Sequence, residues 1–181
     1  NPGFLKVTLQ DTAVGTENEP LPFQSTGESF AISVQALDTG GDPYSFNGTL
    51  KLKVRPGQLE QSDSITVQNG QWQGTVTIKN GFGPTRIWFV DEGDPGGERE
   101  ASHAVGITDP IYYRWPTIAE MQNSGDPASN NLDHEFAQLR MDDRQVVVTA
   151  RDAAGFWVTD SSDPSGSYNS LYVYTFGRPE D

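Results

Sequence analysis

The chain has 181 residues, no cysteine and a formal net charge of −13, with 25 acidic against 12 basic residues. The missing cysteines exclude disulfides, thiolate catalysis and cysteine-based zinc sites. The acidity disfavours nucleic acid as a partner, because phosphate backbones are bound by clustered lysine and arginine. Hydrophobic residues make up 34% of the chain, with 19 Gly and 12 Pro, a mixture that favours an all-β protein with many tight turns. No run approaches the roughly 18 apolar residues of a membrane helix.

The stretch 30–54 carries the clearest pattern, with two alternating runs on either side of a turn-rich segment at 38–43. Apolar residues recur at every second position: Phe30, Ile32, Val34 and Ala36 in the first run, and Leu50, Leu52 and Val54 in the second. This alternation predicts two half-buried antiparallel strands.

The same pattern recurs along the first 108 residues. Further strands are predicted over five ranges: 4–9, 64–67, 72–78, 85–90 and 102–107. Asn69 and Gly70 predict a tight turn that joins 64–67 to 72–78 as a hairpin. The range 85–90 is apolar enough to be buried on both sides. About seven strands in about 105 residues predict a β-sandwich.

The turn residues of this part resemble those of bacterial extracellular Ig-like domains of the invasin or filamin kind. The segments that carry the resemblance are 38–41, 46–49, 69–70 and 74–78, and it covers residues 1–108. It implies a spacer or adhesive module of a secreted or cell-surface protein. Asn47, Gly48 and Thr49 also match a glycosylation sequon, although the backbone needs of a turn explain them equally well.

Residues 109–116 are predicted as an aromatic connector, because the alternation stops and Pro110 removes a ladder donor. Its three aromatic residues and one isoleucine are expected to pack between two modules. Thr117 followed by Glu120 three residues later predicts a capping box that starts a short helix. A polar loop is expected over 123–131.

The range 117–181 is predicted as a second β module. Strands are expected over 145–151, 156–160 and 171–176, and a turn over 152–155. The pattern of residues 117–176 resembles the first half of an OB-fold module that accompanies secreted bacterial nucleases and surface lipoproteins. An OB barrel closes with about five strands, so either the module is truncated or segments such as 111–113 complete the sheet. The catalytic domain of those nucleases has no counterpart here, and no nuclease activity is implied.

Two acidic loops are candidate calcium sites, because hard carboxylate oxygens in a flexible loop suit this ion. Loop 91–95 holds Asp91, Glu92 and Asp94 within four residues, and loop 160–164 is a weaker candidate of the same kind. The alternating ligand pattern of a helix-loop-helix calcium site is missing from loop 91–95. We therefore favour ordinary solvated loops and predict no metal ligand.

Serine-type catalysis would need a base, and the only histidines are His103 and His134. His103 lies in the alternating run 102–105, which predicts an exposed or edge position. His134 is explained by a short solvated helical turn. Paired carboxylates of the glycosidase type are not favoured by any spacing, so we predict no catalytic and no cofactor-binding residue.

Aromatic residues of the second module offer a further candidate site. Phe156 and Trp157 fall on opposite faces of one predicted strand, as do Tyr172 and Val173 on the next. Exposed aromatics on OB barrels can stack against single-stranded nucleic acid or sugars. We favour a core or interface role for four of these residues: Phe156, Val158, Tyr172 and Tyr174.

Taken together, these patterns predict an all-β, acidic chain with an Ig-like β-sandwich followed by a partial OB-like module. The expected function is a non-catalytic, bacterial, extracellular or cell-surface structural protein that acts in adhesion through protein partners or self-association. Two alternatives stay open: an accessory region of a secreted nuclease or hydrolase, and a module that binds glycans or nucleic acid. The first residue, Asn1, is not a methionine, which is expected of a processed or trimmed product.

Overall fold

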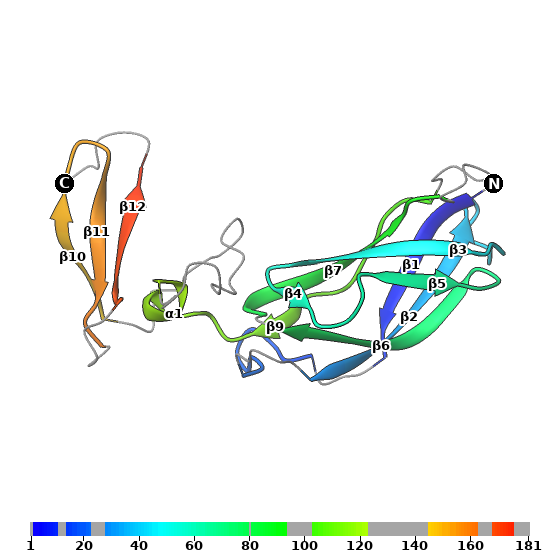
Figure 1. Cartoon of the computed structure of the whole chain (residues 1–181), viewed down its shortest axis with the longest axis horizontal. Coiled ribbons are helices and arrows are strands. Elements are labelled where there is room, and N and C mark those ends of the chain that lie inside the picture. Colours follow the sequence, from blue (N-terminus) through cyan, green and yellow to red (C-terminus); the bar gives the residue numbers. More distant parts are fainter. Residues whose placement is uncertain are drawn as a thin grey trace. The chain divides into compact units, whose positions relative to one another are not determined.

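The computed structural model describes residues 2–10, 14–22, 28–79, 81–93, 103–122, 145–162 and 168–175. The chain forms two compact units, Asn1–Arg114 and Trp115–Asp181. Within the described part, all elements but one short helix are β-strands (Figure 1), which confirms the all-β class. The helix is too short and too polar to cross a membrane.

The first unit is a sandwich of two antiparallel sheets (Figure 1). One sheet has the order β1-β2-β6-β4, and the other has the order β5-β3-β7-β8, with β9 also paired with β7. The strands are β1 (Pro2–Leu9), β2 (Ser29–Asp38), β3 (Gly48–Arg55), β4 (Gln58–Leu59), β5 (Ser64–Val67), β6 (Gln71–Lys79), β7 (Gly83–Asp91), β8 (Gly106–Ile107) and β9 (Ile111–Tyr113). Strands 1, 2 and 6 thus belong to one layer of the sandwich, and strands 3, 7 and 8 belong to the other.

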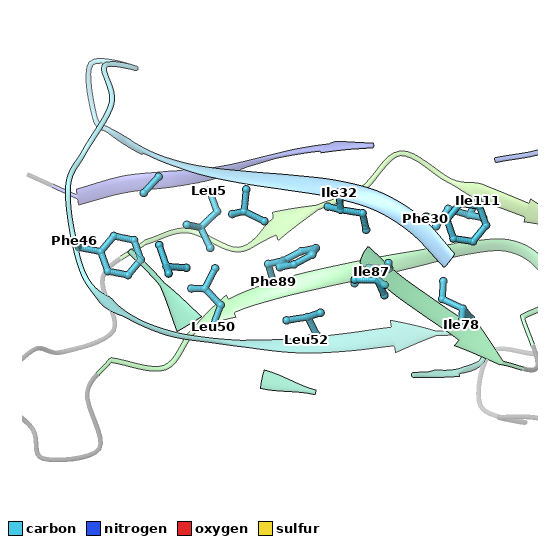
Figure 2. Close-up of a cluster of buried hydrophobic side chains, with 14 of the residues drawn as sticks. Leu5, Phe30, Ile32, Phe46, Leu50, Leu52, Ile78, Ile87, Phe89 and Ile111 are labelled. Atoms are coloured by element: carbon cyan, nitrogen blue, oxygen red, sulfur yellow. The ribbon is translucent and has the colours of Figure 1, made fainter. Parts of the chain in front are cut away.

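The core of the first unit lies between these sheets and follows the period-two pattern. The four apolar residues of β2 are at most 3% exposed, and Leu50 and Leu52 of β3 are at most 2% exposed, while Val54 is half-buried. Figure 2 shows side chains of both sheets meeting in this space, among them Ile32 of β2 and Phe89 of β7. Each fully buried side chain of this size contributes about 1.5 to 3 kcal/mol.

Strand β7 differs from its prediction. The alternate residues Thr85, Ile87 and Phe89 are fully buried, but their neighbours, such as Trp88, are only half-buried. Burial on both sides was therefore the wrong expectation. In a two-layer sandwich only one face of each sheet packs on the other layer, and the outer face meets solvent.

The turn at Asn69 and Gly70 forms as predicted, with φ values of 50° and 74°. The hairpin does not: β5 pairs with β3 and β6 pairs with β2, so the strands enter opposite sheets. Between them only a single bridge, Gln68 to Gln71, remains. A two-residue turn sets the local chain reversal, whereas the sheet that each strand joins depends on partners far away in sequence.

This turn is held by the segment that precedes β3. The Gly70 N–H donates to the Phe46 carbonyl at 2.7 Å, and the Asn69 N–H donates to Asn47 Oδ1 at 2.9 Å. A Cβ at position 70 would lie 1.9 Å from the Tyr44 carbonyl oxygen. The side chain of Asn47 therefore has a structural role in the turn. The needs of the backbone in this turn are thus enough to explain the tripeptide 47–49, which also matches a glycosylation sequon.

Residues 109–116 are not only a connector. Within them, β9 pairs with β7, and Ile111 and Tyr113 are buried in the core of the first unit. Gly81 makes room for the Tyr113 ring, since a Cβ there would lie 2.5 Å from it. Burial, together with the negative charge of Glu28, raises the pKa of the Tyr113 hydroxyl. The first unit consequently extends to Arg114 instead of ending near residue 108.

The described part of the second unit consists of one helix and a three-stranded antiparallel sheet of order β10-β11-β12. These elements are α1 (Ile118–Gln122), β10 (Val146–Arg151), β11 (Gly155–Asp160) and β12 (Ser170–Tyr174). The predicted capping box forms: the Thr117 N–H donates to Glu120 Oε2 and the Glu120 N–H donates to Thr117 Oγ1, each at 2.9 Å. The loop predicted over 123–131 lies outside the described residues.

Candidate functional site

A buried Asp–His pair lies where β7 ends. His103 Nδ1 and Asp91 Oδ2 are 2.7 Å apart, and both side chains are fully buried. The second carboxylate oxygen, Oδ1, accepts the Gly93 N–H at 3.0 Å. Gly93 has a φ of 77°, so a residue without Cβ suits this turn.

Aromatic rings enclose the histidine. The Phe46 ring stacks on the His103 ring with centroids 4.6 Å apart, and the Tyr44 ring meets it edge-on at 5.5 Å. Among the described residues, His103 Nε2 has no hydrogen-bond partner. The carboxylate therefore fixes one ring nitrogen, and the aromatic rings fix the plane of the imidazole.

Both sequence expectations for these residues were wrong. His103 was expected at an exposed or edge position and is 7% exposed, and Asp91 was expected in a solvated loop and is 4% exposed. The pair forms because the chain returns to the end of β7 twelve residues later, a long-range contact that alternation cannot show. Neither side chain has solvent-exposed surface, so the pair lies in the interior of the first unit.

The second acidic loop also begins with a buried carboxylate. Asp160, which is 4% exposed, accepts the Ser162 N–H at Oδ1 at 3.0 Å and also contacts the Ser162 hydroxyl. Across the described ranges, no group of three or more His, Asp and Glu side chains is placed to hold a metal ion. Asp94, Asp163 and His134 lie outside those ranges.

An aromatic strip runs across one face of the second sheet and consists of Trp157, Tyr172 and Tyr174. Trp157 pairs with Tyr172 across the sheet, and Tyr174 lies two residues further along β12 on the same face. Trp157 is 39% and Tyr174 is 55% exposed, and the Trp157 and Tyr172 ring centroids are 4.5 Å apart. Val158, on the other face, is buried as expected of a core residue, but the exposed Tyr174 is not.

Tyr172 is held in place from below and from its hydroxyl end. A Cβ at Gly155 would lie 2.8 Å from its Cζ and hydroxyl oxygen, so the ring lies over the glycine. Its hydroxyl donates to Asp152 Oδ1 at 2.9 Å. Partial desolvation, and then this bond to a carboxylate, raise the pKa of the Tyr172 hydroxyl. Gly155 and Asp152 are thus positioning residues for the aromatic strip.

Next to the strip lies a hydroxyl row made of Thr149, Thr159 and Ser170. Thr159 Oγ1 is 2.8 Å from Ser170 Oγ and 3.3 Å from Thr149 Oγ1. Thr159 and Ser170 form the next cross-strand pair on the face that carries Trp157 and Tyr172. Aromatic rings and hydroxyls therefore share one exposed face of the sheet.

Acid should weaken the turn that orients Tyr172. The Ala154 N–H, the Tyr172 hydroxyl and the Gly155 N–H, in that order of effect, lower the Asp152 pKa below its ordinary 3.8. A carboxyl group whose pKa is lower in the folded protein than in the unfolded chain stabilises the fold. This stabilisation is complete when the pH is above the unfolded-state pKa, and it is lost as the pH falls through the folded-state pKa. Asp152→Asn should therefore make melting of the second unit less sensitive to acid, as checked by calorimetry between about pH 2 and pH 7.

The matched control is Asp38→Asn in the first unit. Backbone N–H groups, above all that of Asp42, likewise lower the pKa of Asp38. Each variant should change the acid sensitivity of its own unit only. An Asp152→Asn protein whose melting follows the wild-type pH profile would contradict the assignment.

The two candidates differ in what they can bind. The Asp–His pair is closed to solvent, whereas the aromatic strip and the hydroxyl row are open to it. Comparisons with protein-family models, with curated proteins and with solved structures find no match for this chain.

Proposed function

We propose that this chain is a non-catalytic structural or adhesive module of a secreted or cell-surface protein, and that it self-associates through β10, an edge strand of the second unit's sheet in the part of the chain that the structure describes. The observation that carries this proposal is the exposure of β10 on both faces. Val147 is 47% and Val148 is 62% exposed, and they lie on opposite faces of the sheet. Such an apolar edge is a template for a further strand.

The edges of the first unit are protected in ways that β10 is not. Its edge strands β4 and β8 have two residues each, and β5 has four. The β1 backbone is bound to the segment that leads into β8, because the Leu5 N–H donates to the Ala104 carbonyl and the Ala104 N–H donates to the Gly3 carbonyl. Strand β10 has six residues and contains no Pro, and its register shift and its one charged residue, Arg151, both come after Val148. The first half of the strand therefore has none of the usual means of blocking an edge.

A second copy of β10 would extend this sheet through backbone hydrogen bonds, with Val147 and Val148 packing against the added strand. Each chain carries a formal charge of −13, so two copies repel each other over a distance set by ionic strength. We expect association to strengthen with added salt. The opposite salt dependence would mean that ion pairs hold the copies together.

The location outside the cell and the non-catalytic character belong to the same proposal. The strand partition supports an Ig-like module, and the turn segments 46–49 and 69–70, which carry the resemblance to bacterial surface domains, contact each other through Asn47 and Asn69. The closed Asp–His pair supports a role in stability over one in catalysis.

The test is Val148→Lys, which places a charge at the edge without removing a buried contact. Sedimentation velocity across a concentration series in about 0.5 M salt should show wild-type self-association. The variant should raise the dissociation constant roughly tenfold or more, because the lysine charge must be desolvated in the interface between the two copies. The matched control is Ile107→Lys, at a 48% exposed residue of the edge strand β8, which should associate like wild type. A monomeric wild type, or an equal effect of both variants, would contradict the proposal.

A further inference from the structure

We propose that the aromatic strip and the hydroxyl row form a binding face for a neutral glycan. This goes beyond the proposed assembly, which uses the edge of the sheet, since the glycan would bind on its face. A pyranose ring presents C–H groups on its faces and hydroxyls at its rim. A site for it therefore needs an exposed aromatic surface with hydrogen-bonding groups beside it.

The aromatic half of this face is preorganised. The Tyr172 ring is held by Gly155 beneath it, by the bond from its hydroxyl to Asp152, and by the Trp157 ring beside it. Ala150 is the cross-strand neighbour of Trp157 on its other side, so no large side chain covers the indole from β10. Rings held in this way lose little conformational entropy when a ligand stacks on them.

The polar half consists of side chains that match sugar hydroxyls. Thr149, Thr159 and Ser170 each both donate and accept, and the Asp152 carboxylate accepts. The Thr159–Ser170 pair lies one same-face step from the Trp157–Tyr172 pair, roughly 7 Å along the strands. A pyranose ring stacked on the aromatic strip can therefore direct the hydroxyls at its rim toward the hydroxyl row.

Charge selects a neutral ligand over a polyanion. By register Arg151 pairs with Phe156, on the face opposite the aromatic strip. Among the described residues of β10, β11 and β12, no Lys or Arg lies on the strip's own face. Stacking of nucleic acid bases needs such cations to neutralise phosphate. A neutral glycan needs none, and a carboxylate at the end of the strip suits its hydroxyls.

The length of the strip indicates an oligosaccharide. Tyr174 lies two residues beyond Tyr172 along β12, a distance of roughly 7 Å. With Trp157 on the neighbouring strand, the rings extend along and across the sheet. We therefore infer that the face takes consecutive units of a chain and binds a single sugar only weakly.

The experiment uses the full chain on an array of neutral glycans, followed by isothermal titration with hexasaccharides of β-1,4-linked glucose and β-1,4-linked N-acetylglucosamine. We expect saturable binding of at least one neutral glycan. Trp157→Ala should weaken it roughly tenfold or more, because a stacked aromatic contributes on this scale. Trp157→Phe should restore most of the affinity. Tyr174→Ala, at a more exposed ring, tests the face independently should Trp157→Ala fail to fold.

Two controls separate this inference from the proposed assembly. Phe4→Ala removes an aromatic that is 42% exposed in the first unit and should leave glycan binding unchanged. Val148→Lys should weaken self-association and still bind glycan. The inference is overturned if no neutral glycan binds wild type, if Trp157→Ala and Tyr174→Ala both bind as wild type does, or if only a single-stranded oligonucleotide binds. Loss of self-association in Trp157→Ala without any glycan binding would make the face a protein interface instead.

Discussion

Replacement of Asp91 by alanine should lower the free energy of unfolding of the first unit by roughly 3 kcal/mol or more. The change leaves His103 Nδ1 and the Gly93 N–H without this buried carboxylate. Breaking a buried charged interaction by removing one partner costs far more than the net contribution of the intact pair. Urea denaturation of the full chain, followed by circular dichroism, measures the loss.

A double-mutant cycle separates the pair from its surroundings. His103→Phe keeps an aromatic ring between Tyr44 and Phe46 while it removes the bond to Asp91. The two changes should be non-additive by about 1 to 3 kcal/mol, because both remove the same interaction. An Asp91→Ala protein within about 1 kcal/mol of wild type, or additive effects, would show that the pair contributes little.

Asp91→Ala should also weaken the backbone hydrogen bonds between β1 and the segment before β8. His103 directly precedes Ala104, whose backbone bonds to Gly3 and Leu5 tie the segment before β8 to β1 of the other sheet. By holding His103, Asp91 fixes the position of this bridge. Hydrogen exchange at the Leu5 and Ala104 amides should therefore be faster in Asp91→Ala, by a larger factor than at amides of β2.

Phe89→Ala should produce the other large effect, a loss of roughly 3 to 5 kcal/mol, because a fully buried aromatic is replaced by a cavity. Phe89 lies at the centre of the core in Figure 2, and the Trp72 ring centroid is 6.3 Å from its own. Part of the cost depends on how far Trp72 can move into the space.

The matched control is Phe4→Ala, the same substitution at a residue that is 42% exposed. It should cost less than about 1 kcal/mol, since little buried surface is lost. Calorimetry of both variants gives the comparison. Similar losses at the two positions would mean that the core does not lie between these two sheets.

Much of the local structure could be predicted because its causes are local. The alternation in β2 and β3, the Asn69–Gly70 turn and the Thr117–Glu120 capping box each depend on residues within a few positions. The Asp152 turn belongs to the same group, with its carboxylate accepting the Ala154 N–H at 2.8 Å. The aromatic strip could be predicted only in part, since alternation placed Trp157 and Tyr172 on particular faces of their strands but did not show that their rings lie against each other.

What the sequence by itself determined is a repeating two-residue burial pattern with turns between its runs, because steric and hydrogen-bonding preferences act over a few residues. Only the tertiary structure decided that β5 and β6 part into opposite sheets, that β9 completes the first unit, and that Asp91 meets His103 in the interior. These outcomes depend on contacts between residues distant in the chain. Their free energy comes from burial and pairing that exist only after the two sheets have closed on each other.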